Sequence, residues 1–352
     1  MTEFERWLGE GFVQLNTVFE EAYFAAGQEY APDLGQEEVL HEGAKRLPGL
    51  EREHSLEGDR YRLLGSVGLY LAACARHRVE DEEVLAPAWA LATRLGTSLG
   101  VAPRYVFAHQ SLYGFRTFTS LPDEQAFVRL NGLAVVAYER AAHALRLVAT
   151  TGVDSPVVEH LLGEARRALE DVLSFNRVLA ETVDPQRFYL GIRPYFRSHR
   201  VGTQVYRGVN AGDFAAVNEI DLLLGLCRAD DPFYQRIVAE KLPYVPPDHQ
   251  TRLHQAVLVE PLLHRFLREP LYAGLFLDVC RAHGAAYALH HGRLVKPFLE
   301  AQAGAEQDVT ASGPPLSVVV AELAHLVDLR TARPRAGAFG AHEELRRLAE
   351  LV

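Results

Sequence analysis

Histidine is the residue type in this sequence that can serve the most chemical roles, because a neutral imidazole can bind a metal and can titrate near neutral pH. The chain has 15 histidines among its 352 residues. His249 and His254 are five positions apart and do not share a helix face, which argues against a metal site built on them. His290 and His291 are adjacent and lie in a segment with helical periodicity, so this second pair is the stronger candidate.

An apolar stripe runs along the helix predicted around this pair. Its members step by three or four positions: Phe276, Cys280, Tyr287, His291, Leu294 and Phe298. His290 falls on the row of Arg293 and Pro297, so we expect His291 to face the interior and His290 to be more exposed. An enclosed histidine is either a core residue bonded to a backbone carbonyl or an axial ligand of a haem iron. Periodicity alone favours the first interpretation.

The common short catalytic motifs are absent. The sequence contains no GxGxxG, GxxxxGK[ST], HExxH or GxSxG, which argues against the usual nucleotide sites, zinc proteases and serine hydrolases. The cysteines, Cys74, Cys227 and Cys280, are far apart and form no CxxC pair, which disfavours disulfides and thiolate metal sites.

A second candidate segment, residues 187–209, reads RFYLGIRPYFRSHRVGTQVYRGV. Its aromatic pair, Phe188 and Tyr189, would suit a flat substrate, and the Arg193 guanidinium would suit a carboxylate. Without further information, the better interpretation of the aromatic pair is an ordinary part of a core, and that of the arginine is a structural ion pair.

This segment resembles the signature of the indoleamine 2,3-dioxygenase superfamily and, within it, the PrnB family. The similarity continues through DFAAVNEIDLLLGL and DDPFYQRIVAEKLPYVPP, and upstream through SLPDEQAFVRLNGLAVVAYERAAHAL. Downstream, LHHGRLVKPFLE lies where the superfamily carries its iron-binding histidine, and TASGPP where it carries a small-residue loop. The similarity keeps its order over roughly residues 70–330.

The resemblance implies a haem b cofactor and a role for several residues. His291 matches the proximal haem ligand, as the spacing to the following LVKPFL indicates. On the substrate side, the matching positions are the aromatic pair with its arginine, the hydroxyl residue of the small loop, and two positions of the long helix: Phe188, Tyr189, Arg193, Ser312, Asn131 and Val135.

The function that the resemblance implies is a haem-dependent oxidoreductase of specialised metabolism. It would use O₂ or peroxide at the iron to oxidise tryptophan or a modified tryptophan. The alternatives are an oxygenase acting on another amino acid or amine, and a haem-binding protein without turnover.

The elements that must position these residues are predicted to be helices, since strand-like alternation is scarce. The longest span about residues 63–77, 82–95, 120–150, 155–182, 248–267, 271–300 and 316–329, with Ser120 as an N-cap and Gly152 as a helix end. A break at 112–122 predicts a small N-terminal helical domain, residues 1–115, and a larger haem-binding domain, residues 116–352. The expected fold is all-α and indoleamine dioxygenase-like.

The composition is that of a globular protein, with 48% hydrophobic and 23% charged residues. A formal net charge of −10 argues against partners such as nucleic acid or an anionic membrane. No apolar run approaches the ~20 residues of a membrane span, and the acidic start is unlike a signal peptide. We therefore expect a cytoplasmic protein whose partners are a small-molecule substrate and O₂. Lysine is rare: the chain has Lys45, Lys241 and Lys296.

Overall fold

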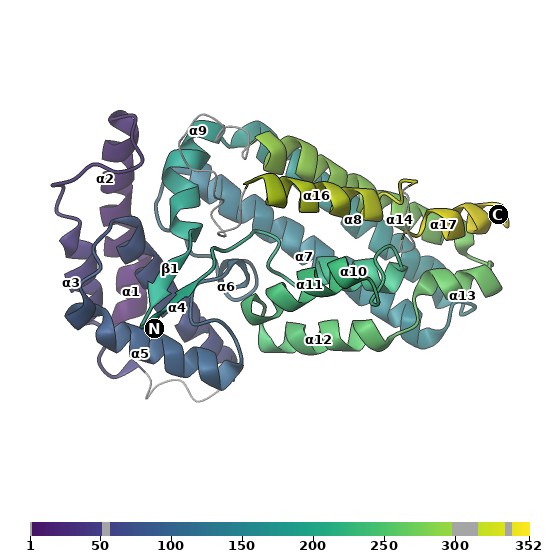
Figure 1. Cartoon of the computed structure of the whole chain (residues 1–352), viewed down its shortest axis with the longest axis horizontal. Coiled ribbons are helices and arrows are strands. Elements are labelled where there is room, and N and C mark those ends of the chain that lie inside the picture. Colours follow the sequence, from purple (N-terminus) through teal and green to yellow (C-terminus); the bar gives the residue numbers. More distant parts are fainter. Residues whose placement is uncertain (1, 51–56, 298–315, 335–339) are drawn as a thin grey trace.

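The described part of the chain is almost wholly helical, which confirms the predicted all-α class. The computed structural model describes residues 2–50, 57–297, 316–334 and 340–352. Within these residues the strands are β1 (His199–Val201) and β2 (Gln204–Tyr206), an antiparallel hairpin. The molecule is elongated, with the first helices gathered at one end and the C-terminus at the other (Figure 1). None of the helices that the structure describes is both long and apolar enough to cross a membrane.

The N-terminal end is built around one central helix. Its elements are α1 (Glu3–Gly9), α2 (Gly11–Ala25), α3 (Glu37–Lys45), α4 (Glu57–Arg76), α5 (Glu82–Leu99) and α6 (Phe107–Ser111). Between Tyr61 and Cys74, α4 is buried on almost every side, as its nearly continuous apolar sequence predicts. Aromatic rings from α1 pack edge-on against it, with the Phe4 and Tyr70 ring centroids 6.1 Å apart.

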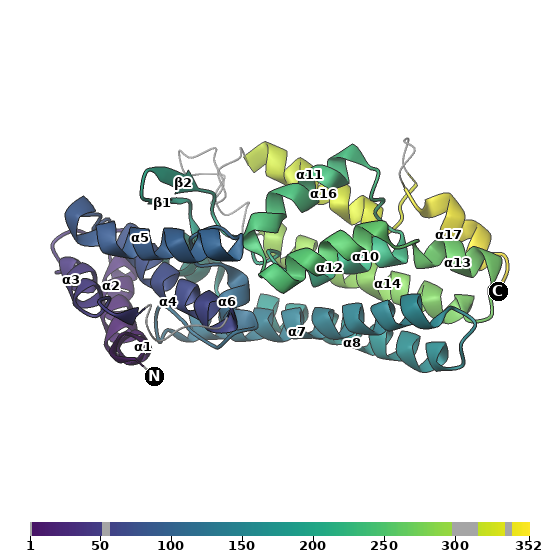
Figure 2. The ribbon, with the colours of Figure 1, turned by 90° about the horizontal axis from the view of Figure 1, so that it is seen from below.

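A long antiparallel pair, α7 (Pro122–Thr151) and α8 (Val157–Thr182), runs along most of the molecule (Figure 2). The predicted extents of both helices are confirmed. Pro122 occupies the first helical position, where its missing N–H costs nothing, and Leu121 rather than Ser120 is the N-cap. Gly152 ends α7 with a φ of 92°, a conformation that glycine adopts without strain.

After α8 the chain turns through short elements: α9 (Pro185–Arg187), a π-helical turn η2 (Phe188–Ile192) and a 3₁₀ turn η3 (Arg193–Phe196). The hairpin follows, and then α10 (Ala216–Leu224), α11 (Pro232–Lys241) and η4 (Leu242–Tyr244). The remaining elements are α12 (Pro247–Leu258), α13 (Leu262–Arg268), α14 (Ala273–His290), η5 (His291–Val295), α16 (Leu316–Arg330) and α17 (His342–Ala349).

Two of the predicted C-terminal helices differ from the structure. The helix expected over residues 248–267 is divided into α12 and α13, because Val259 is extended and Pro261 cannot continue a helix. The helix expected over residues 271–300 begins at Ala273, and its α-helical part ends at His290, where the π-helical turn η5 takes over.

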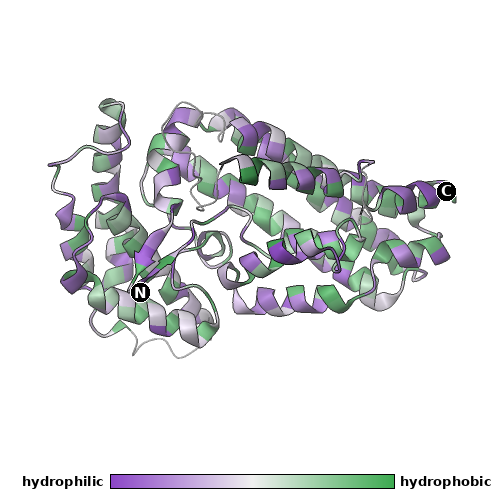
Figure 3. Ribbon diagram, viewed as in Figure 1, coloured by the Kyte–Doolittle hydropathy of each residue, from purple (hydrophilic) through white to green (hydrophobic). Residues whose placement is uncertain are grey.

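The apolar core consists of two main clusters that meet along α7. Phe127 and Val128 belong to the N-terminal cluster, whereas Ala134 and the residues after it pack with α8, α10 and α14. Hydrophobic and hydrophilic residues alternate along most helices, as expected of amphipathic helices that each bury one face (Figure 3). Because α7 serves both clusters, the two ends are joined by a continuous helix. The domain division at residue 115 stays a prediction.

We predict that Gly68→Ala strongly destabilises the protein. A Cβ at Gly68 would overlap the backbone nitrogen of Tyr105 and lie 2.8 Å from the carbonyl carbon of Arg104, and backbone cannot give way as a side chain can. Overpacking of this kind costs about 1–3 kcal/mol or more. The matched control is Gly58→Ala in the same helix, where no atom lies within 4 Å of the new methyl group. Urea denaturation should show a lower midpoint for the first variant alone, and equal midpoints for both would contradict this packing.

Candidate functional site

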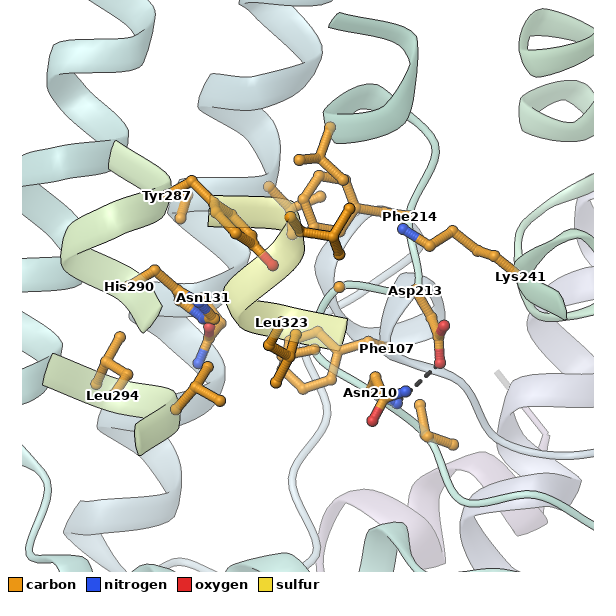
Figure 4. Close-up of a pocket in the computed structure, with 18 of the residues that line it drawn as sticks. Phe107, Asn131, Asn210, Asp213, Phe214, Lys241, Tyr287, His290, Leu294 and Leu323 are labelled. Atoms are coloured by element: carbon orange, nitrogen blue, oxygen red, sulfur yellow. Dashed lines mark hydrogen bonds between the residues drawn. The ribbon is translucent and has the colours of Figure 1, made fainter. Parts of the chain in front are cut away.

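A cavity of about 410 Å³ lies between α7, α8, α14, α16 and the loop that precedes α10. Its size is that of a small-molecule site. Aromatic and aliphatic side chains form most of its wall, among them Phe107, Phe127, Ala134, Val135, Leu179, Phe188, Phe196, Val209, Phe214, Val217, Leu294, Leu323 and Leu326. A smaller set of polar side chains interrupts this wall (Figure 4).

His290, the last residue of α14, is the histidine of the cavity wall, and His291 does not line it. Figure 4 shows the His290 side chain beside Asn131 and one helical turn from Tyr287. Desolvation by burial, followed by the nearby His291 and Arg330, lowers the pKa of His290 to about 4. The imidazole is therefore neutral at pH 7, and its nitrogen lone pair is not blocked by a proton. We find no hydrogen bond to either ring nitrogen from any residue that the structure describes.

The expectation that His291 faces the interior and His290 is the more exposed is not met, because both side chains are half-buried and His290 is the one that lines the cavity. Tyr287 and Leu294 both line the cavity, and they fix the direction of the helix face. His290 is three positions after Tyr287 and four before Leu294. His291 is four positions after Tyr287 and three before Leu294. A periodicity of 3.6 accepts either residue. The π-helical turn that begins at His291 also changes the helical phase at this point. The sequence pattern does not predict this turn.

Four other residues singled out in the sequence line the same cavity: Asn131, Val135, Phe188 and Arg193. The Asn131 amide nitrogen donates to the Phe127 carbonyl oxygen at 2.8 Å, which fixes the orientation of the amide. Tyr189 does not line the cavity. Ser312 lies outside the described residues, as does the small-residue loop around it.

Arg193 is a buried cation without a carboxylate partner among the residues described. Its guanidinium lies 5.3 Å from the centre of the Tyr189 ring, and burial lowers the pKa of Arg193. The nearest acidic group that acts on it, Glu29, is already held by Arg197 through two hydrogen bonds. A buried guanidinium at a cavity wall is a donor set suited to an anionic ligand group.

A buried ion pair forms the wall beyond Tyr287. Arg330 of α16 donates to Asp221 of α10, with Nη2 2.6 Å from Oδ2. The same carboxylate is within hydrogen-bond distance of His283 Nε2 at 2.7 Å, and it accepts from the Tyr234 hydroxyl at 2.7 Å. Desolvation would raise the pKa of Asp221, but the Arg330 cation and the His283 contact hold it below its usual value. One carboxylate therefore joins α10, α11, α14 and α16.

This ion pair also sets the position of Tyr287. The Arg330 guanidinium lies over its ring, 3.9 Å from the ring centre, and both residues line the cavity. Since Tyr287 and His290 are one turn apart on α14, the pair fixes the side of the helix that faces the cavity. The sequence gives no signal for it, because the partners are 109 positions apart.

Sequence reasoning also missed a polar group of the cavity wall formed by Asn210, Asp213, Asn218 and Lys241. Figure 4 shows Asn210, Asp213 and Lys241 across the cavity from His290. Lys241 makes a short hydrogen bond to Asn218 Oδ1. Desolvation by burial lowers the pKa of Lys241 to about 8. A signal did exist: lysine is rare in this chain, and Lys241 is the one that belongs to the similar segment ending in LPYVPP.

Asp221→Asn should destabilise the fold because it leaves Arg330 as a buried cation without its counter-charge, a loss of about 3–5 kcal/mol. Chemical denaturation gives the measurement. The matched control is Asp230→Asn, which breaks an exposed pair with Arg228 and should leave the midpoint near that of the wild type. The pKa of Asp221 is depressed in the folded protein, so its contribution is present above its unfolded pKa and is lost as the pH falls towards its folded pKa. Equal stability of the two variants would argue against this role.

Comparison with known protein families agrees with this architecture. The family model described as "Monodechloroaminopyrrolnitrin synthase PrnB" matches residues 1–352, the full length of the chain. The all-α fold is the one expected from the resemblance of the 187–209 segment. The match over the whole length shows that the chain belongs to the PrnB family of enzymes.

Proposed function

We propose that the chain is a haem-dependent oxidoreductase acting on an indole amino acid, tryptophan or a modified tryptophan, in specialised metabolism. The observation that carries the proposal is the pairing of two groups in one apolar cavity. His290 offers a neutral imidazole that no described residue engages through a hydrogen bond, and Arg193 offers a buried cation without a carboxylate from the described chain. Membership of the PrnB family supports the enzymatic role.

The residues of the cavity fit a haem. Such a group needs one protein nitrogen on the iron and an apolar surround for the macrocycle, and both are present around His290. When bound, haem supplies the iron at which O₂ or peroxide is activated for oxidation of the substrate. The chain would supply the axial imidazole, the exclusion of water and the orientation of the substrate.

The sequence favours His291 as the residue that would hold the haem iron, and the geometry favours His290, so we propose His290 for this role. This choice rests on the cavity wall alone: burial lowers the pKa of both imidazoles, but only the His290 side chain reaches the cavity. A histidine of α14 could hold the iron only if its imidazole reaches the cavity, and the His290 imidazole does so.

Substrate orientation would depend on the aromatic wall and on Arg193. The Phe127 and Phe188 ring centroids are 5.0 Å apart and tilted by 55°, so they form one apolar corner against which a flat indole can pack. Arg193 lines the same cavity as these two rings and would bind the amino-acid carboxylate through bidentate hydrogen bonds. Holding the two ends of the substrate in this way fixes which ring atoms face the iron.

His290→Ala should abolish stoichiometric haem binding, whereas His291→Ala should retain it. Among the described residues, the first variant removes the one imidazole that lines the cavity, and the second removes an imidazole outside the wall. Titration of each purified protein with haem, followed by Soret absorption, gives the stoichiometry and the affinity. Loss of haem in the His291 variant, with retention in the His290 variant, would return the axial role to His291.

Arg193→Leu should weaken binding of L-tryptophan by about 2–5 kcal/mol, since a buried charge pair with the carboxylate would be lost. Tryptamine, which lacks the carboxylate, should bind the variant and the wild type equally. The shift of the haem absorption bands during titration provides the measurement. Arg187→Leu is the control, because that guanidinium lies over the Phe24 ring, 3.8 Å from its centre, and does not line the cavity. Equal affinity of the wild-type protein for tryptophan and tryptamine would refute the assignment of Arg193.

A further inference from the structure

Lys241 is the last residue of α11, and its side chain lines the cavity. In Figure 4 its ammonium group points towards Phe214, on the other side of the cavity from His290. The side chain is half-buried, and desolvation by burial lowers the pKa of Lys241 to about 8. The part of its surface that faces the cavity is poorly solvated, which favours the neutral form.

Lys241 differs from the cations beside it on the cavity wall. Arg207 is paired with Asp213 at 2.9 Å, and Arg330 is paired with Asp221 at 2.6 Å. No ion pair joins Lys241 to a carboxylate of the described chain. A cation that is desolvated without a counter-charge is costly, and native proteins keep one chiefly where a ligand supplies the charge.

The hydrogen bonds around Lys241 fix the direction in which it can bind. Asn218 accepts from the ammonium group through Oδ1, and its amide nitrogen donates to the Tyr234 hydroxyl at 2.9 Å. That hydroxyl donates to Asp221 at 2.7 Å, so the amide cannot turn over without breaking the chain of bonds. An ammonium group has three donors, and one of them is used by Asn218.

Asp213, the nearest acidic neighbour of Lys241, is not available as its partner. Its carboxylate accepts two hydrogen bonds from Arg207, at 2.9 and 3.0 Å, and one from the Asn210 backbone N–H at 2.8 Å. It attracts Lys241 over a distance but makes no hydrogen bond to it. The ammonium group belongs to a side chain of the cavity wall, and no described residue accepts a hydrogen bond from its other two donors.

We propose that Lys241, oriented by Asn218, forms a subsite that binds a carboxylate of a molecule in the cavity. The inference rests on the proposed function: since Arg193 is assigned the carboxylate of the amino-acid substrate, the carboxylate left for Lys241 is a propionate of haem, and the substrate carboxylate is the other source that the test distinguishes. The subsite is separate from Arg193, because Lys241 interacts with Asn218 and Asp213 whereas Arg193 lies beside Tyr189.

Replacement of Lys241 by methionine separates a binding role from a structural one. Lys241→Met keeps the length of the side chain and removes a desolvated cation that has no carboxylate from the described chain. The affinity of the variant for the carboxylate ligand should fall, whereas its ligand-free melting temperature should change little, because removal of a desolvated cation opposes the loss of the hydrogen bond to Asn218 Oδ1. A purely structural lysine would instead lower the melting temperature on replacement and leave every affinity unchanged. Lys241→Arg keeps the charge and should retain most of the affinity.

The test compares the wild type, Lys241→Met, Lys241→Arg and the control Lys45→Met, whose lysine is exposed and paired with Glu42. Each protein is titrated with haem and with its dimethyl ester, followed by Soret absorption. Each is also titrated calorimetrically with L-tryptophan and with tryptamine. Loss of a charge-assisted hydrogen bond should weaken the binding of the affected ligand about 10- to 100-fold in Lys241→Met.

The pattern of losses identifies the source of the carboxylate. If Lys241 binds a propionate, Lys241→Met loses affinity for haem but not for the dimethyl ester. If it binds the substrate, the loss is confined to L-tryptophan and spares tryptamine. Equal affinities of the wild type and Lys241→Met for every ligand overturn the subsite. A wild-type protein that takes up no haem refutes the proposed function instead. In that case the calorimetric titrations test Lys241: weaker binding of L-tryptophan, but not of tryptamine, by Lys241→Met supports the subsite, and equal affinities of the two proteins for both ligands overturn it.

Discussion

The ion pair between Asp221 and Arg330 is the interaction on which the cavity depends. Both side chains are almost fully buried, and the same carboxylate contacts His283 of α14 and Tyr234 of α11. Four helices therefore meet at one charge that cannot be left unpaired without a large cost in stability. The Arg330 guanidinium then holds the Tyr287 ring, and Tyr287 sets the face of α14 that carries His290. The position of the candidate iron ligand thus follows from a contact that lies outside the coordination site.

The polar groups of the cavity wall fall into two kinds. Asp221, Arg330, Arg207 and Asp213 satisfy one another through short contacts within the chain. His290, Arg193 and Lys241 differ, because the described residues offer neither a carboxylate for the two cations nor a hydrogen bond to the imidazole. Buried polar groups in native proteins are normally paired, so unpaired ones that share a cavity indicate a ligand. The complementary ligand would have one metal centre, an apolar body and carboxylates.

The fold was predictable where local chemistry decides it. Pro122 at the start of α7 and Gly152 at its end follow the rules of helix termini, and α7 and α8 match their predicted extents. The division of the 248–267 segment does not follow from helical periodicity, which continues across the break, and the local signal for it is Pro261. The hairpin at residues 199–206 was also missed, since its strands are too short to show an alternating pattern.

The candidate site was only partly predictable. Asn131, Val135, Phe188 and Arg193 came from a resemblance to a family, and nothing in their local patterns set them apart from core residues. Neighbouring positions 290 and 291 satisfy the same periodicity, so the choice between them needed the tertiary structure. The lowered pKa of Lys241 follows from burial, and its lack of a carboxylate partner follows from the pairing of Asp213 with Arg207. Both are long-range consequences of folding.

A crystal structure of the protein prepared with haem tests the central claim most directly. We expect electron density for haem inside this cavity, with an imidazole nitrogen of His290 on the iron. Coordination by His291, or haem bound elsewhere on the chain, would contradict it.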